Sequence, residues 1–96
     1  MNNVNKDKLS ELLLSEDKEL RKLGISLLIS NFNLPEKLYC IYNKYGDYYI
    51  SIGPQKDFSI SLSKKDYLEW FENQFVSKEQ KTVLLSAIIK YNEEYR

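Results

Sequence analysis

The chain has 96 residues, of which 43% are hydrophobic and 29% are charged. This balance argues against disorder and predicts a single domain over residues 1–96 with one core. Fourteen basic residues match fourteen acidic ones, so the formal net charge is zero, which argues against a protein that holds nucleic acid through summed positive charge.

The N-terminal third of the chain predicts two helices. Leucines at helical spacing predict a first helix over residues 6–14. Ser15 is a suitable N-cap for a second helix over about residues 16–30, in which Gly24 allows close packing of a neighbour. The apolar stripe of this helix consists of Leu20, Leu23 and Leu27. Because Ile25, Leu28 and Ile29 cover much of the remaining surface, we expect its second half to be heavily buried.

The second helix also carries three cations beside its acidic residues. These are Lys18, Arg21 and Lys22, interspersed with Glu16, Asp17 and Glu19. Mixed charges of this kind are typical of a solvated helical face, and we favour that interpretation over a phosphate-binding stripe. The helix is expected to end before Pro35, since the residue preceding a proline is pushed out of helical geometry.

One segment of this helical region resembles a known pattern. Residues 12–31, LLLSEDKELRKLGISLLISN, resemble a helix–step–helix segment found in small uncharacterised proteins of AT-rich bacteria and their phages. The resemblance implies a helical pair and a phage or mobile-element origin, and it assigns no functional residue.

The middle of the chain, residues 38–62, predicts three strands. Gly46-Asp47 lies between aromatic and β-branched runs, which is a hairpin signal because glycine adopts the positive φ of tight turns. With these two residues as the loop, Ile41 faces Ile52 and Asn43 faces Ile50. A Gly-Pro turn then leads into a third strand, which predicts an antiparallel meander.

Strand alternation divides this sheet into two faces. The face expected to point inward carries Tyr39, Ile41, Ile50 and Ile52, extended by Phe58, Ile60 and Leu62. The opposite face carries Cys40, Tyr42, Lys44, Tyr49 and Ser51, with Ser59 and Ser61 beside them. Two interpretations of the opposite face stay open: it is an exposed binding surface, or helices cover it as a second core layer.

Two further helices complete the predicted fold. Ser63 caps the first of them, in which Tyr67, Leu68, Phe71 and Phe75 line one side and Trp70 lies at its border. Ser77 and Gln80 form a capping box for the last helix, whose apolar face consists of Leu84, Leu85, Ile88, Tyr91 and Tyr95. The predicted fold class is therefore α+β, in the order ααβββαα, with a three-stranded antiparallel meander packed with helices.

The residue types present argue against an enzyme. Histidine is absent, so Ser-His and Cys-His nucleophiles and histidine-based zinc sites are excluded, and the three scattered glycines form no phosphate loop. The helical carboxylates Asp66, Glu69 and Glu72 are interpreted as a solvated polar face. We predict no catalytic residue, no cofactor and no metal site.

The remaining hypothesis is a non-enzymatic protein–protein interaction module, phage or mobile-element encoded, that binds or inhibits another protein or assembles into a larger structure. Its expected binding residues are Tyr42, Lys44 and Tyr49, with Trp70 as an edge contributor, because tyrosine is enriched in binding surfaces. The alternative is a single-strand nucleic-acid-binding protein that uses the same Tyr/Lys face, although the zero net charge disfavours a nucleic-acid partner.

The sequence also leads to expectations about cellular location and assembly. We expect a cytoplasmic protein, because one cysteine forms no internal disulfide and the N-terminus lacks the pattern of a signal peptide. No apolar run approaches the roughly 20 residues of a membrane span, so no membrane partner is expected. Pairing of edge strands leaves a homo-oligomer open.

Overall fold

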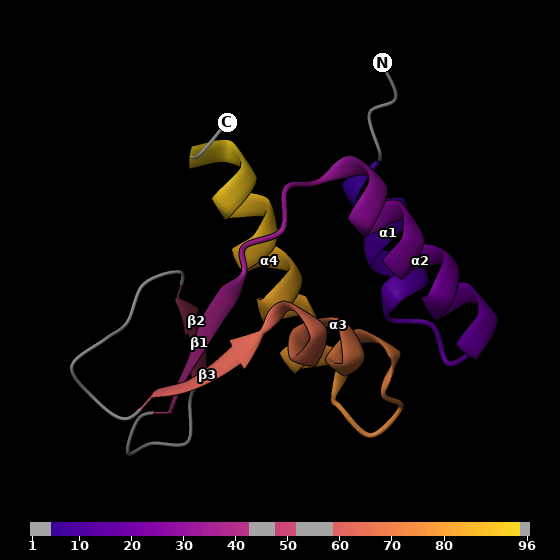
Figure 1. The fold of residues 1–96 in the computed structure, drawn as a ribbon. Coiled ribbons are helices and arrows are strands. Elements are labelled where there is room, and N and C mark those ends of the chain that lie inside the picture. Colours follow the sequence, from indigo (N-terminus) through magenta and orange to yellow (C-terminus); the bar gives the residue numbers. More distant parts are fainter. Residues whose placement is uncertain (1–4, 43–47, 52–58, 95–96) are drawn as a thin grey trace.

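The computed structural model describes residues 5–42, 48–51 and 59–94 of the chain (Figure 1). Its elements in chain order are α1 (Lys6–Leu13), α2 (Lys18–Asn31), β1 (Lys37–Tyr42), β2 (Tyr48–Ser51), β3 (Ser59–Ser63), α3 (Lys64–Glu72) and α4 (Lys78–Glu94). The helices have 8, 14, 9 and 17 residues and the strands have only 6, 4 and 5. The protein is a helix-rich α+β domain.

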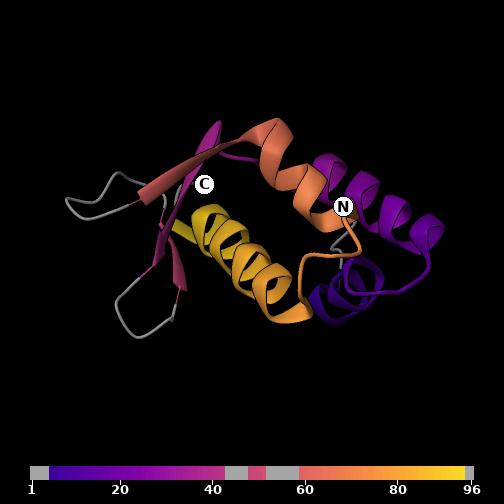
Figure 2. The same cartoon turned by 90° about the horizontal axis from the view of Figure 1, so that it is seen from below.

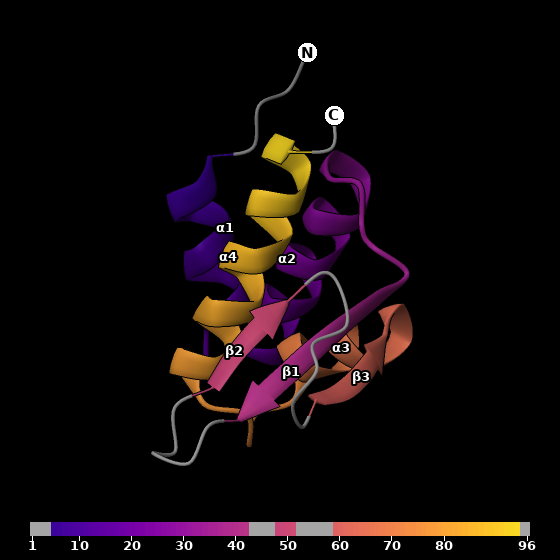
Figure 3. The same cartoon turned by 90° about the vertical axis from the view of Figure 1, so that its left-hand side faces the viewer.

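The longest helix, α4, lies between the sheet and the helical pair α1–α2 (Figure 2). It packs on β2 on one side and on α1 on the other, while α3 contacts α2, β1 and β3. The start of α1 lies beside the end of α4, where the Lys6 ammonium and the Glu93 carboxylate are 2.9 Å apart (Figure 3). Helix α4 therefore forms part of the core for both halves of the domain.

Local capping explains where the helices begin. The side chains of Asn5, Asp17 and Ser63 accept backbone N–H groups in the first turns of α1, α2 and α3. Ser15, the predicted cap of the second helix, is instead part of the connection, and its hydroxyl accepts the Asp17 N–H at 3.0 Å. The capping box at Ser77 is confirmed, because the Gln80 N–H donates to the Ser77 hydroxyl at 3.1 Å.

The predicted fold is wrong in its sheet. A meander would place the strands in sequence order, but the observed order is β2-β1-β3, with β1 paired antiparallel to both neighbours. Pairing β3 with β1 sets Leu62 opposite Leu38, and both leucines are buried in the core. It also places the start of α3 beside the residue before β1, where the Lys64 N–H donates to the Glu36 carbonyl oxygen at 3.0 Å. Burial of these leucines favours β1 over β2 as the partner of β3.

The predicted register is wrong as well. Cys40, and not Asn43, pairs with Ile50, which exchanges the two faces of β1 because the offset is an odd number of residues. Leu38 and Cys40 are therefore buried in the core, whereas Tyr39, which was expected to point inward, is only half-buried. The side chain of Ile41 lies outside the described part. The described pair nearest the hairpin connection is Tyr42 with Tyr48, and the predicted two-residue loop falls outside the described part. Residues 43–47 of this connection lie outside the described part, as do Ile52 and Phe58.

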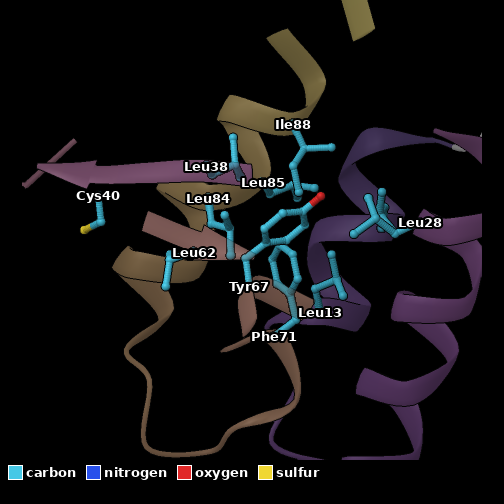
Figure 4. Close-up of a cluster of buried hydrophobic side chains, with 11 residues drawn as sticks. Leu13, Leu28, Leu38, Cys40, Leu62, Tyr67, Phe71, Leu84, Leu85 and Ile88 are labelled. Atoms are coloured by element: carbon cyan, nitrogen blue, oxygen red, sulfur yellow. The ribbon is translucent and has the colours of Figure 1, made fainter. Parts of the chain in front are cut away.

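The core combines the helices with the inner face of the sheet (Figure 4). Its largest side chains are Tyr67 and Phe71 of α3, both fully buried. The Tyr67 hydroxyl donates to the Pro35 carbonyl oxygen, and burial raises the pKa of this phenol, with Glu36 and Tyr91 adding to the shift. The predicted core positions Leu84, Leu85 and Ile88 of α4 and Leu62 of β3 are confirmed.

Two other predicted core positions are wrong. Ile60 is on the inner side of β3, opposite Cys40, but it is 59% exposed at the edge of the sheet. Phe75 follows the end of α3 and is 86% exposed. Helix α3 stops at Glu72 because Asn73 turns the chain out of helical geometry and its side chain accepts the Phe75 N–H at 2.8 Å.

Close packing of α1 against α2 depends on Gly24. A Cβ atom at this position would lie 3.0 Å from Leu12 Cβ and 3.0 Å from Leu13 Cδ2. We expect Gly24→Val to lower the free energy of unfolding by about 2 kcal/mol, because the added methyl groups force the helices apart. Urea denaturation measures this loss, and Ser26→Val on the exposed side of the same helix is the control. Equal stability of the two variants would show that α1 moves away from the added side chain without a loss of folding free energy.

Candidate functional site

The structure places the predicted binding residues only in part. Lys44 lies outside the described residues, and Tyr42 and Tyr49 are described only as backbone positions of β1 and β2. The register pairs Tyr42 with Tyr48 and Ile41 with Tyr49, whereas the prediction put positions 42 and 49 on one face. Trp70 is half-buried and packs against the core. The binding role of these residues stays a prediction.

A pocket of about 580 Å³ lies elsewhere, where the α1–α2 connection meets the α3–α4 connection and the first turns of α4. Its volume is in the range of small-molecule sites. Three cations line it, Arg21, Lys78 and Lys81, together with one carboxylate, Glu16. We call this region the Lys81 pocket.

Arg21 lines the Lys81 pocket and is 4% exposed. Its Nε donates to the carbonyl oxygen of Glu72 at 3.0 Å, at the end of α3. Its Nη1 donates to the carbonyl oxygens of Ser15 at 3.0 Å and Glu16 at 2.8 Å, just before α2. The guanidinium therefore joins two chain segments through their backbone. The prediction of a solvated helical face is wrong for Arg21.

Lys81 lies in the second turn of α4 and is also 4% exposed. Its pKa is lowered, first by burial and then by the positive charges of Arg21 and Lys78. Within the described part of the chain, no hydrogen bond or ion pair joins the Lys81 ammonium to another residue, although its backbone N–H donates to the Ser77 carbonyl oxygen. Native proteins rarely bury an amine without an acceptor.

Sequence analysis missed both buried cations. Lys81 precedes Leu84, Leu85 and Ile88 by three, four and seven residues, which places it on the core-facing side of α4. This periodicity could have indicated the burial of Lys81. The indication for Arg21 is weaker: it falls between the leucines of α2, and only two of the fourteen basic residues are arginines.

Helix α2 leaves apolar side chains partly uncovered beside its core-facing side, and one of them, Leu27, also packs against the core. Leu20 is 42% exposed and Leu23 is 49% exposed, while Leu27 is half-buried. These three residues, spaced i, i+3 and i+7, are called the α2 ridge. Ile29 is also exposed, so the prediction that the second half of this helix is heavily buried is wrong for Ile29. The faces that do enter the core carry Arg21, Gly24 and Leu28.

Neither a metal-binding cluster nor a membrane-spanning helix is found among the described residues. Over residues 5–42, 48–51 and 59–94 no three metal-ligating side chains of His, Cys, Asp or Glu gather into a group that could hold an ion. Among the helices described, none has the length and apolarity to cross a bilayer. Comparisons with protein-family models, curated proteins and solved structures give no match.

Proposed function

We propose that the protein is a non-enzymatic protein-binding module that contacts another protein through the α2 ridge. The observation that supports this most directly is the exposure of Leu20 and Leu23, 42% and 49%, on a helix that packs on the core through Gly24 and Leu28. Adjacent exposed leucines keep apolar surface in water, which a partner would cover.

The spacing of the ridge favours a helix of another protein as the partner. Side chains at i, i+3 and i+7 form the seam along which two helices pack. Ser26 and Ser30 continue the same side of α2 and are exposed, and short side chains there let a second helix approach closely. The proposed occupant is an amphipathic helix whose apolar side covers Leu20, Leu23 and Leu27.

The cellular location and the biological context of the interaction are part of the same proposal. We place the interaction in the cytoplasm, because the one cysteine, Cys40, is buried in the sheet and forms no disulfide. The resemblance of residues 12–31 supports a phage or mobile-element context, in which the partner would be a protein that this chain binds or inhibits. Nucleic-acid binding through Tyr42, Lys44 and Tyr49 gains no support from a described side chain and stays an alternative prediction.

The test is a paired substitution on the ridge. We expect Leu20→Ser combined with Leu23→Ser to weaken partner binding by about 10- to 100-fold, because apolar contact residues at the centre of an interface dominate its affinity. Quantitative affinity capture from the native host should identify a protein bound by the wild type and lost from this variant, and calorimetry with the purified partner then gives the affinity.

Lys22→Ser, on an exposed position of the same helix, is the matched control and should retain the partner. Unchanged capture by the ridge variant would contradict the proposal. So would a concentration-dependent dimer of the wild type that the ridge variant abolishes, since the ridge would then be covered by a second copy of the chain.

A further inference from the structure

The Lys81 pocket presents a positive charge that the fold leaves unmatched. The Lys81 ammonium is buried beside Arg21, and within the described residues no carboxylate lies in ion-pair contact with it. Glu16 lines the pocket but is exposed, and only its carbonyl oxygen is engaged by Arg21. A buried cation without a counter-charge at the wall of an open cavity is the arrangement expected of an anion site before its ligand binds.

We propose that the Lys81 pocket binds a carboxylate that carries an apolar body, with the Lys81 ammonium as the charged partner of the carboxylate. Leu14, Val76 and Phe75 line the same pocket and offer contact to the apolar part of the ligand. Phe75 is 86% exposed, and a bound acid would cover part of its ring. The carboxylate and the apolar body thus find complementary groups in one cavity.

The first turn of α4 adds to the preference for an anion. Ser77 and Lys78 line the pocket, so the positive end of the helix dipole borders it. This feature would not identify a site without Lys81, which supplies the buried ammonium three residues into the same helix. Lys78 is exposed and adds a positive charge at the mouth.

The charges favour a monoanion over a phosphate. Arg21 already donates through Nε and Nη1 to three backbone carbonyl oxygens, so it is not free to grip an anion with its full fork. Glu16 lines the pocket and Glu79 follows in the first turn of α4, and both would repel a doubly charged group. One carboxylate balances the Lys81 ammonium, while the Arg21 guanidinium keeps the three carbonyl oxygens as its acceptors.

The experiment is a titration of the full chain with sodium phenylacetate, followed by two-dimensional amide NMR. We expect saturable shifts at the backbone of Ser15, Lys78 and Lys81, and no saturation with uncharged phenylacetamide. Lys81→Met should weaken phenylacetate binding about tenfold or more, whereas Lys22→Met, which removes an exposed lysine, should leave it unchanged. Lys81→Gln is a second variant, and thermal unfolding verifies that each variant is folded.

The source of the carboxylate is distinguished by a second ligand. A blocked dipeptide of leucine and glutamate represents an acidic side chain of a bound protein, and phenylacetate represents a free acid; the tighter of the two identifies the source. Equal binding of phenylacetate to wild type and Lys81→Met would overturn the proposal, as would inorganic phosphate displacing phenylacetate at lower concentration. The site does not depend on the α2 ridge, so Leu20→Ser with Leu23→Ser should bind phenylacetate as the wild type does.

Discussion

Replacing Lys81 by methionine is expected to raise the free energy of unfolding by about 1–3 kcal/mol, in contrast to most core substitutions. The methionine side chain has a similar length and volume but needs no hydrogen-bond acceptor, and the wild-type ammonium has none within the described residues. For a domain of this size each kcal/mol corresponds to about 4–8 °C in melting temperature.

The stability advantage of Lys81→Met over the wild type should decrease as the pH rises. Burial lowers the pKa of Lys81 from its ordinary value of 10.5, so between the lowered pKa and 10.5 the unfolded chain binds more protons than the folded chain. The stability of the wild type relative to the variant therefore rises as the pH increases through this window. Below the window the cost of burying the charge is fully present, and the variant has its largest advantage.

Urea denaturation of both proteins at several pH values from neutral to alkaline measures this difference. The comparison cancels the titration of other lysines and tyrosines, since both proteins share them. Lys22→Met, at an exposed position, should show no such pH-dependent difference from the wild type. A loss of stability in Lys81→Met at neutral pH would show that the ammonium has a structural acceptor.

The expected stabilisation connects Lys81 to ligand binding. A residue that destabilises the unliganded fold is retained more readily if it binds something, because a ligand stabilises the folded state by RT ln(1 + [L]/Kd). Phenylacetate at saturating concentration should therefore narrow the stability gap between wild type and Lys81→Met. The same ammonium thus lowers the stability of the free protein and raises that of the complex.

The helices could be predicted from the sequence because their signals are local. Leucine spacing gave α1, and the capping box at Ser77 with the apolar face of Leu84, Leu85 and Ile88 gave α4. The end of α3 was missed because Phe75 continued the apolar pattern, although Asn73 supplies a side chain that competes for the backbone.

The sheet was predicted wrongly because its arrangement is decided by distant contacts. Gly46-Asp47 favoured a two-residue hairpin, but the pairing of Cys40 with Ile50 instead buries Leu38 and Cys40 together. Assigning Cys40 to the polar face reversed β1, although cysteine behaves as a small apolar residue when buried. No local pattern shows that β3 pairs with β1, because that choice depends on where α3 must pack.

The cations of the Lys81 pocket were missed for a different reason. Charged residues are exposed so commonly that sequence analysis assigns them to solvent, and the carbonyl oxygens that Arg21 binds leave no mark in the sequence. Ser15, Glu16 and Glu72 contribute their backbone, which every residue possesses. The helical position of Lys81 was informative only when read together with the leucines that follow it.

Replacing Arg21 by methionine is expected to lower the free energy of unfolding by about 3–5 kcal/mol, a large share of the stability of a small domain. The substitution keeps the apolar stem but removes both donors, so the carbonyl oxygens of Ser15, Glu16 and Glu72 lose their bonds to the guanidinium. Removing Arg21 also removes its repulsion with Lys81, which opposes this loss. We expect this gain to be smaller than the cost of losing three hydrogen bonds.

Urea denaturation at neutral pH measures the loss, with Lys22→Met as the control on the adjacent, exposed position of α2. Arg21→Lys keeps the charge but cannot reach both chain segments with one planar group, so we expect it to recover less than half of the lost stability. Full recovery by lysine would mean that charge and not the fork holds the segments together. A loss below about 1 kcal/mol in Arg21→Met would mean that water replaces the guanidinium at these carbonyl oxygens.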